Sequence, residues 1–308
     1  MKIFYHRADY DGIGSAAVIN NFLHNEEFEE NKLLNNVKNV EFIGADYPDD
    51  SEKYYSEITD GDRVLFIDYI LQPFNLMLDL SKRCEVIVID HHLTTINNFK
   101  NENNYLFYEV ILGDEGNSKA ACQLIWEYLY PGSHIPLTLL WLSKYDVWKH
   151  EDDEEILNFQ LGIRNKRPDF NSKMWNELLV HSKSEENLDL LNEIIDEGEI
   201  ISTYEVNSND FLINEGAFNF KLNNYNIIAV NTDKRGSKIF DSIFNPEIHD
   251  ICMPFVLLKN GKWRYSLYSS KSDIDCSSIA KLYGGGGHRG AAGFQTNKLL
   301  EEINGQTS

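Results

Sequence analysis

Short apolar runs alternate with longer amphipathic stretches along the first half of the chain. Runs rich in Ile, Val and Phe predict buried strands at 2–6, 40–47, 63–69 and 85–90. The apolar spacing of helices appears at 12–24, 73–82, 117–130 and 136–147, and an acidic helical pattern covers 151–200. Asn117 or Ser118 is a suitable cap for one of these helices. Strands separated by helices favour a mainly parallel sheet covered by helices on both faces.

The pattern changes in the second half. The segment 184–210 has the apolar spacing of one long amphipathic helix, and the turn pair Asn260-Gly261 divides a strand pattern at 254–269. A strand pattern also covers 218–231, and a short helix is predicted at 276–283. We therefore predict an α/β protein with three parts: an N-terminal domain at 1–184, a connecting helix at 185–209 and a smaller C-terminal α/β domain at 210–308.

Charge and composition narrow the function. The 308 residues include 28 basic and 49 acidic side chains, a net charge of −21, which opposes binding to a long polyanion but not to a small phosphorylated ligand held by metal. No apolar run approaches the roughly 20 residues that a membrane span needs. The start of the chain does not resemble a signal peptide, and the four scattered cysteines are typical of reduced thiols. We expect a cytoplasmic protein with no membrane partner.

Acids and histidines follow three of the predicted strands. The first strand leads into His6, Asp9 and Asp11, the third ends at Asp68, and the fourth ends at Asp90-His91-His92. A single Asp after a strand is ordinarily a helix cap or a turn residue. In an open parallel sheet, however, ligands bind beyond the carboxyl ends of the strands, so three such clusters should meet at one edge. Asp146 ends an apolar helix and alone would be a helix-end residue.

Carboxylates with a few imidazoles suit Mn²⁺ or Mg²⁺ better than a thiolate site would. A pair of such ions about 3.5–4 Å apart can clamp the attacking and leaving oxygens of a phosphoryl group. The side chains available for this pair are His6, Asp9, Asp11, Asp68, His91 and Asp146.

A glycine run lies near the C-terminus, at 284–287. Glycines allow backbone N–H groups to approach an anion, and His288 and Arg289 stand next to the run as donors. A flexible loop is the alternative interpretation. We take Gly285, Gly286 and Gly287 as candidate substrate contacts.

Together, the segments HRADYDG, FIDY, VIDHH and KYD resemble the DHH phosphoesterases, and IAKLYGGGGHRGAAGF is similar to the accessory DHHA1 domain. The resemblance covers nearly the whole chain and implies a two-domain hydrolase with a Mn²⁺ pair. One metal would take His6, Asp9 and Asp68. The other would take Asp11, His91 and Asp146 and share Asp68 as a bridge. His92 would face the scissile phosphate, Asp90 would orient the histidines, and a hydroxide activated by the two metals would attack.

Two positions depart from the family pattern. The DHHA1 domain commonly has an Arg where this chain has Tyr268, so Arg264, Lys271 or Arg289 would have to supply the charge, or Tyr268 would stack on a base. The spacing from His6 to Asp9 is also one residue shorter than in many bacterial nanoRNases.

The leading hypothesis is a Mn²⁺-dependent phosphodiesterase, with Mg²⁺ as a possible substitute, that hydrolyses short oligonucleotides such as linear dinucleotides. A 3′-phosphoadenosine 5′-phosphate phosphatase and a RecJ-type single-strand exonuclease are the enzymatic alternatives, and a nucleotide-sensing module is the non-enzymatic one. The expected partner is a short oligonucleotide or nucleotide rather than a long duplex, bound by a monomer or homodimer.

Overall fold

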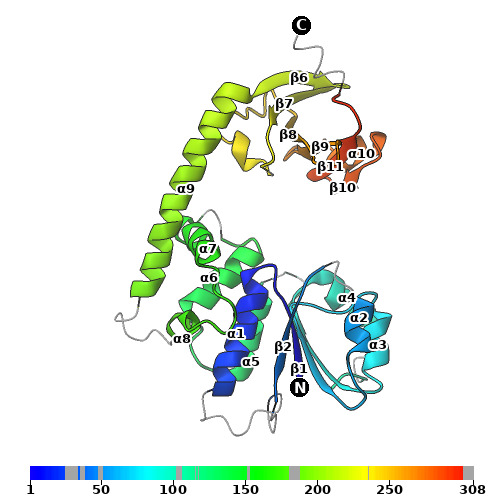
Figure 1. Cartoon of the computed structure of the whole chain (residues 1–308), viewed down its shortest axis with the longest axis vertical. Coiled ribbons are helices and arrows are strands. Elements are labelled where there is room, and N and C mark those ends of the chain that lie inside the picture. The colour runs from blue at the N-terminus through cyan, green and yellow to red at the C-terminus, as the bar shows by residue number, and fades with distance from the viewer. Residues whose placement is uncertain are drawn as a thin grey trace. The chain divides into compact units, whose positions relative to one another are not determined.

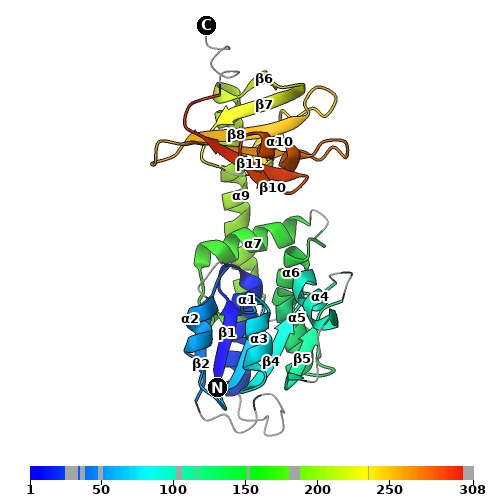
Figure 2. The same ribbon diagram turned by 90° about the vertical axis from the view of Figure 1, so that its right-hand side faces the viewer.

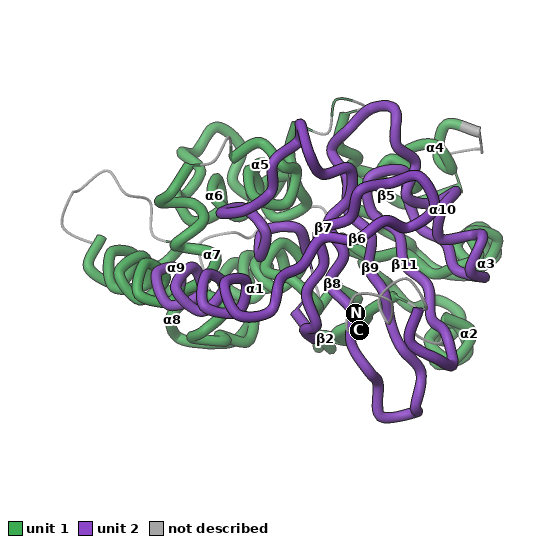
Figure 3. Tube along the Cα trace, turned by 90° about the horizontal axis from the view of Figure 1, so that it is seen from above, with its two compact units in different colours: residues 1–201 green, residues 202–308 purple. Residues whose placement is uncertain are grey.

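The computed structural model describes residues 1–24, 34, 39–47, 51–101, 106–114, 116, 118–150, 153–179, 188–234 and 236–300. The chain divides into two compact units, Met1–Ile201 and Ser202–Ser308, which Figure 3 shows in different colours. The helix α9, Asp189–Gly216, crosses the division. The boundaries expected at 184 and 209 stay a prediction.

The first unit contains a five-stranded sheet in the order β2-β1-β3-β4-β5, and every neighbouring pair is parallel. Its strands are β1 (Lys2–His6), β2 (Glu41–Ala45), β3 (Arg63–Ile67), β4 (Glu85–Asp90) and β5 (Glu109–Leu112). The first four match the predicted strands, while β5 was not predicted. Because the central strands are apolar on both faces, they require cover on both sides.

Helices pack on both faces of this sheet, as Figure 1 shows. Alternate residues of each strand belong to two separate cores: Ile67 and Ile89 pack with one set of helices, and Phe66 and Val88 with the other. The first set is α1 (Tyr10–His24), α5 (Ala121–Leu129), α6 (Leu137–Asp146), α7 (Glu154–Lys166) and α8 (Met174–Leu178). The second is α2 (Ser51–Ser56), α3 (Asn75–Leu80) and α4 (Leu93–Asn101). The predicted fold class is confirmed.

The helical pattern predicted over 151–200 is not one continuous helix. α7 ends at Lys166 because Arg167 adopts a left-handed conformation (φ 50°) and Pro168 follows, which cannot continue the helical hydrogen bonds. Two further helices, α8 and α9, cover other parts of that range. Of the helices in the described part of the chain, none combines the length and apolarity needed to cross a membrane.

The second unit is built on a six-stranded mixed sheet in the order β10-β11-β9-β8-β7-β6, several strands of which are visible in Figure 2. Only β7 and β8 pair in parallel among its neighbours, and the predicted Asn260-Gly261 hairpin joins β8 to β9. The strands are β6 (Phe218–Leu222), β7 (Tyr225–Asn231), β8 (Ile251–Leu257), β9 (Trp263–Tyr268), β10 (Gly286–Gly287) and β11 (Ala291–Thr296), and α10 (Cys276–Leu282) packs on the sheet.

Candidate metal centre

The acids and histidines expected at the strand ends lie together at one edge of the first sheet. His6 is the last residue of β1, Asp68 directly follows β3, and His91 directly follows β4. Because β1, β3 and β4 are adjacent and parallel, their carboxyl ends fall side by side. Asp146, the last residue of α6, joins them from the helical layer.

One group of ligand atoms is formed by His6, Asp9 and Asp68. The Nδ1 atom of His6 lies 3.0 Å from Asp9 Oδ2 and 3.4 Å from Asp68 Oδ2. Gly12 makes this turn possible, because a Cβ at that position would lie only 1.9 Å from the carbonyl oxygen of His6. The Gly12 N–H also donates to Asp9 Oδ1 at 3.1 Å. The turn from β1 into α1 therefore holds His6 and Asp9 at one point.

A second group is formed by Asp11, His91 and Asp146. The Nε2 atom of His91 lies 3.2 Å from Asp146 Oδ2, 3.6 Å from Asp11 Oδ2 and 3.4 Å from Asp68 Oδ1. Asp9 and Asp11 thus belong to different groups although one residue separates them. The structure thus brings together the side chains expected in each ligand set, and their role as metal ligands stays a prediction.

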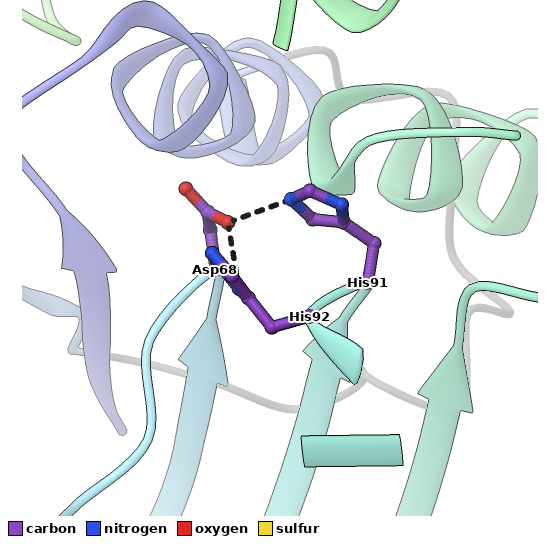
Figure 4. A group of neighbouring side chains, drawn as sticks. All are labelled: Asp68, His91 and His92. Carbon is purple, nitrogen blue, oxygen red and sulfur yellow. Dashed lines mark ion pairs between the residues drawn. The ribbon is translucent and has the colours of Figure 1, made fainter. Parts of the chain in front are cut away.

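Asp68 lies between the two groups: its Oδ2 atom is 3.4 Å from His6 Nδ1 and its Oδ1 atom is 3.4 Å from His91 Nε2. It also forms a third possible ligand group with His91 and His92. Figure 4 shows its side chain beside His91 and His92, with His92 Nδ1 3.7 Å from Asp68 Oδ1. The backbone of Asp68 is left-handed (φ 56°), a conformation that Asp and Asn tolerate better than most residues. Asp68 is almost fully buried, and its side chain is central to the cluster.

The charges of the cluster shift the pKa values of several of its members. Burial lowers the pKa of His6, but the carboxylates of Asp68 and Asp9 outweigh burial and raise that pKa to about 10. Burial acts in the same direction on His91, and Asp146 and Asp68 overcome it and raise the pKa of His91 to about 12. Burial and the carboxylates of Asp68 and Asp146 raise the pKa of Asp11 well above its usual range. The carboxylates therefore produce a strongly negative local potential, which favours bound protons or cations.

The donor set fits divalent metal. Within the part of the chain that the structure describes, His6 Nδ1 and Asp68 Oδ1 are buried and make no hydrogen bond. Buried polar atoms without hydrogen bonds are costly unless a ligand or ion satisfies them. Carboxylate oxygens mixed with imidazole nitrogens are ligands that Mn²⁺ and Mg²⁺ accept.

Asp90 contacts the histidines rather than the proposed metal positions. Its Oδ1 atom accepts hydrogen bonds from the backbone N–H groups of His91 (2.7 Å) and His92 (2.9 Å) and lies 2.7 Å from His92 Nδ1. Its Oδ2 atom accepts from the Thr95 hydroxyl at 2.8 Å. Nδ1 of His92 therefore faces Asp90, and Nε2 is the ring nitrogen that faces away from it. The His92 side chain is 44% exposed.

Asp11 has a second role that its place in the sequence does not reveal. Both of its carboxylate oxygens accept backbone N–H groups at the start of α5, from Ala121 at 2.9 Å and Cys122 at 2.8 Å. The suggested cap Ser118 was wrong: α5 begins later, at Ala121, and its N-cap residue Ala120 offers no side-chain bond. The other suggested cap, Asn117, lies outside the described residues. Asp11 thus provides the cap from 110 residues away in the chain.

Asp46, at the carboxyl end of β2, was also missed. Its Oδ1 atom lies 3.8 Å from His6 Nε2, and its Oδ2 atom accepts a hydrogen bond from Arg7 Nε at 2.8 Å. The rule that singled out the other strand ends applies here too, and it would have found this residue.

The candidate substrate contacts lie in the second unit around a cavity of about 640 Å³. Arg264, Tyr268 and the glycine run line it, together with Lys262, whereas His288 and Arg289 are not among its lining residues. The glycine N–H groups are partly committed: those of Gly284 and Gly285 donate to carbonyls of α10. β10 pairs with β11, so the loop is shorter than the run of four glycines indicated.

Tyr268, which stands where the family pattern has an Arg, makes a hydrogen bond to the backbone. Its hydroxyl accepts a hydrogen bond from the Gly236 N–H at 3.0 Å, which ties β9 to the loop after β7. Arg264 donates to the Asp233 carbonyl at 3.0 Å and contributes positive charge to the same cavity.

The chain is similar to known proteins over its N-terminal part and over its length. The DHH family N-terminal domain model matches residues 1–146. The uncharacterized protein R106 of Acanthamoeba polyphaga mimivirus is 24% identical over 300 residues, which are 95% of this chain but 66% of that protein's length.

Two solved structures are similar in fold. One is PggH, a pGpG-specific phosphodiesterase from Vibrio cholerae (TM-score 0.50, 13% identity, covering 99% of this chain and 95% of that one). The other is the DHH domain of a protein assigned to a family of ribosomal proteins (TM-score 0.55, 11% identity, 99% and 84% covered). At these identities the likeness is one of fold, and it agrees with the match to the family model. Residues 1–146 of the chain therefore form a DHH family N-terminal domain.

Proposed function

We propose that this protein is a metal-dependent phosphodiesterase that hydrolyses short oligonucleotides, with two Mn²⁺ ions per chain or Mg²⁺ in their place. The observation that carries the proposal is the position of Asp68 between two ligand groups, with one oxygen facing His6 and the other facing His91. A bridging carboxylate with terminal ligands on both sides is what a two-metal phosphoryl-transfer site requires. The name of the similar phosphodiesterase from Vibrio cholerae is consistent with this class of substrate.

Each residue of the cluster has a separate part in this proposal. His6, Asp9 and Asp68 would hold one ion, and Asp11, His91, Asp146 and Asp68 the other. Bound divalent ions lower the pKa of water and neutralise phosphate charge. His92 would contact the phosphate through Nε2, because Nδ1 lies against Asp90. Asp90 would fix the orientation of both histidines from behind.

Two further observations support a small substrate. The cavity of the second unit, about 640 Å³, is within the size range of small-molecule sites, and Lys262 and Arg264 make its lining basic. The net charge of −21 opposes the extended electrostatic support that a long strand needs. We propose that Arg264, Tyr268 and the glycines 285–287 bind one part of the substrate, with His288 and Arg289 as neighbouring donors.

The test is a panel of substrates with Mn²⁺ or Mg²⁺ at fixed salt. It contains RNA and DNA strands of two to twenty-four nucleotides, linear and cyclic dinucleotides, and 3′-phosphoadenosine 5′-phosphate. We expect kcat/KM to be highest at two to five nucleotides and to fall steeply with length. A flat profile, or faster decay of the longest strand, favours the exonuclease alternative. Selective release of phosphate from the mononucleotide favours the phosphatase, and binding without turnover favours a sensing module.

A further inference from the structure

The two residues that follow β2, Asp46 and Tyr47, contact His6 from two directions. The carboxylate of Asp46 lies 3.8 Å from His6 Nε2. The ring of Tyr47 lies against the imidazole, with centroids 6.1 Å apart and planes inclined by 49°. β2 is the neighbour of β1, with His6 opposite Ala45, so the segment that follows β2 begins beside the carboxyl end of β1.

The two nitrogens of His6 have different neighbours. Nδ1 faces Asp9 and Asp68, which makes Nδ1 the atom available to a metal, whereas Nε2 faces Asp46. A histidine that binds metal through one nitrogen typically directs the N–H of the other toward a carboxylate, which fixes the ring orientation and the tautomer. Arg7 contacts the second oxygen of Asp46 at 2.8 Å and limits how that carboxylate can turn.

Tyr47 links the end of β2 to the turn that carries Asp68. Its hydroxyl accepts a hydrogen bond from the Ile70 N–H at 2.9 Å and donates to the Ile70 carbonyl at 3.1 Å. Its ring also packs on the buried ring of Tyr69, with centroids 4.8 Å apart. The turn just after Asp68 is therefore held against the residue that touches His6.

We propose that Asp46 and Tyr47 are positioning residues for the first metal site, the one formed by His6, Asp9 and Asp68. The charge of Asp46, 3.8 Å from Nε2, would favour the His6 proton on that nitrogen, and Nδ1 would then be the ligand atom for an ion. Tyr47 holds the His6 ring and the turn after Asp68 in fixed positions relative to each other. This inference rests on the proposed metal dependence and extends it to residues outside both ligand groups.

The experiment is a Mn²⁺ titration of the full chain by calorimetry, without substrate. The variants are Asp46→Ala, Asp46→Asn and Tyr47→Phe, which retains the ring and removes only the hydroxyl. Asp60→Ala is the matched control, because Asp60 is an exposed acid of the same unit that also pairs with an arginine, Arg83. We expect Asp46→Ala to weaken one of two sites by about 10–100-fold and leave the other unchanged. Tyr47→Phe should weaken the same site, and Asp60→Ala neither.

A double-mutant cycle with His6→Ala separates positioning from other roles. If Asp46 acts through His6, removing Asp46 from the His6→Ala protein causes little further loss of affinity. A full additional loss would mean that Asp46 binds metal by itself and would overturn the proposal, as would unchanged affinity in all Asp46 and Tyr47 variants. Thermal unfolding of each metal-free variant identifies any that fail to fold. Wild-type protein that binds no divalent metal would instead overturn the proposed function.

Discussion

The shared position of Asp68 gives a quantitative prediction for Asp68→Asn. The two carboxylate oxygens lie 3.4 Å from His6 Nδ1 and 3.4 Å from His91 Nε2, one in each ligand group. Asn preserves the shape and tolerates the left-handed backbone (φ 56°), so the change removes charge rather than structure. A charge-assisted contact contributes about 1.5–3 kcal/mol. Each metal site should therefore weaken by roughly 10–150-fold, since about 1.4 kcal/mol corresponds to tenfold.

The measurement is a Mn²⁺ titration of the metal-free protein, compared with Asp9→Asn and Asp146→Asn. Each of those changes touches only one ligand group, so each should weaken a single site. Thermal unfolding of metal-free Asp68→Asn shows whether the variant folds, because the change removes both the repulsion from Asp11 and the attraction to His6 and His91. Turnover should fall below detection. An Asp68→Asn protein that keeps either site at native affinity would refute the bridging assignment.

Other predictions concern the second unit and the shell around the cluster. Gly285→Ala should destabilise the protein by about 1–3 kcal/mol in denaturant unfolding, because its Cβ would lie 2.1 Å from the Gly293 carbonyl oxygen. Gly286→Ala has no atom within 4 Å of its Cβ and should unfold normally, yet raise KM because Gly286 lines the cavity; an unchanged KM would exclude a substrate contact there. Asp90→Asn should lower kcat more than it lowers metal content, because the charge of Asp90 orients His92. Kinetics and metal analysis of the same protein check this, and a larger loss of metal than of kcat would contradict it. Excess chelator should lower the unfolding temperature of metal-loaded wild type by several degrees, because each site filled at about one hundred times its Kd stabilises by roughly 2.7 kcal/mol; an unchanged midpoint would contradict tight metal binding.

The sequence alone predicted the outline of the first unit and which acids and histidines lie at the edge of its sheet. Apolar β-branched runs identify β1, β3 and β4 because a strand covered on both faces has no polar position to interrupt the run. Ligands bind at the carboxyl ends of parallel strands, and this rule predicts from the sequence alone that Asp68 and His91 lie close together. The Asn260-Gly261 hairpin could also be predicted from adjacent residues alone, because the turn requires a positive φ and Gly261 adopts one.

Tertiary structure alone decided which oxygens and nitrogens face one another. The cap of α5 comes from Asp11, 110 residues earlier, and no local pattern near Ala121 contains that information. Asp46 approaches His6 only because β2 pairs with β1, and strand order is a property of the assembled sheet. Residue types and spacing specify which groups are present, whereas packing between distant segments specifies their contacts.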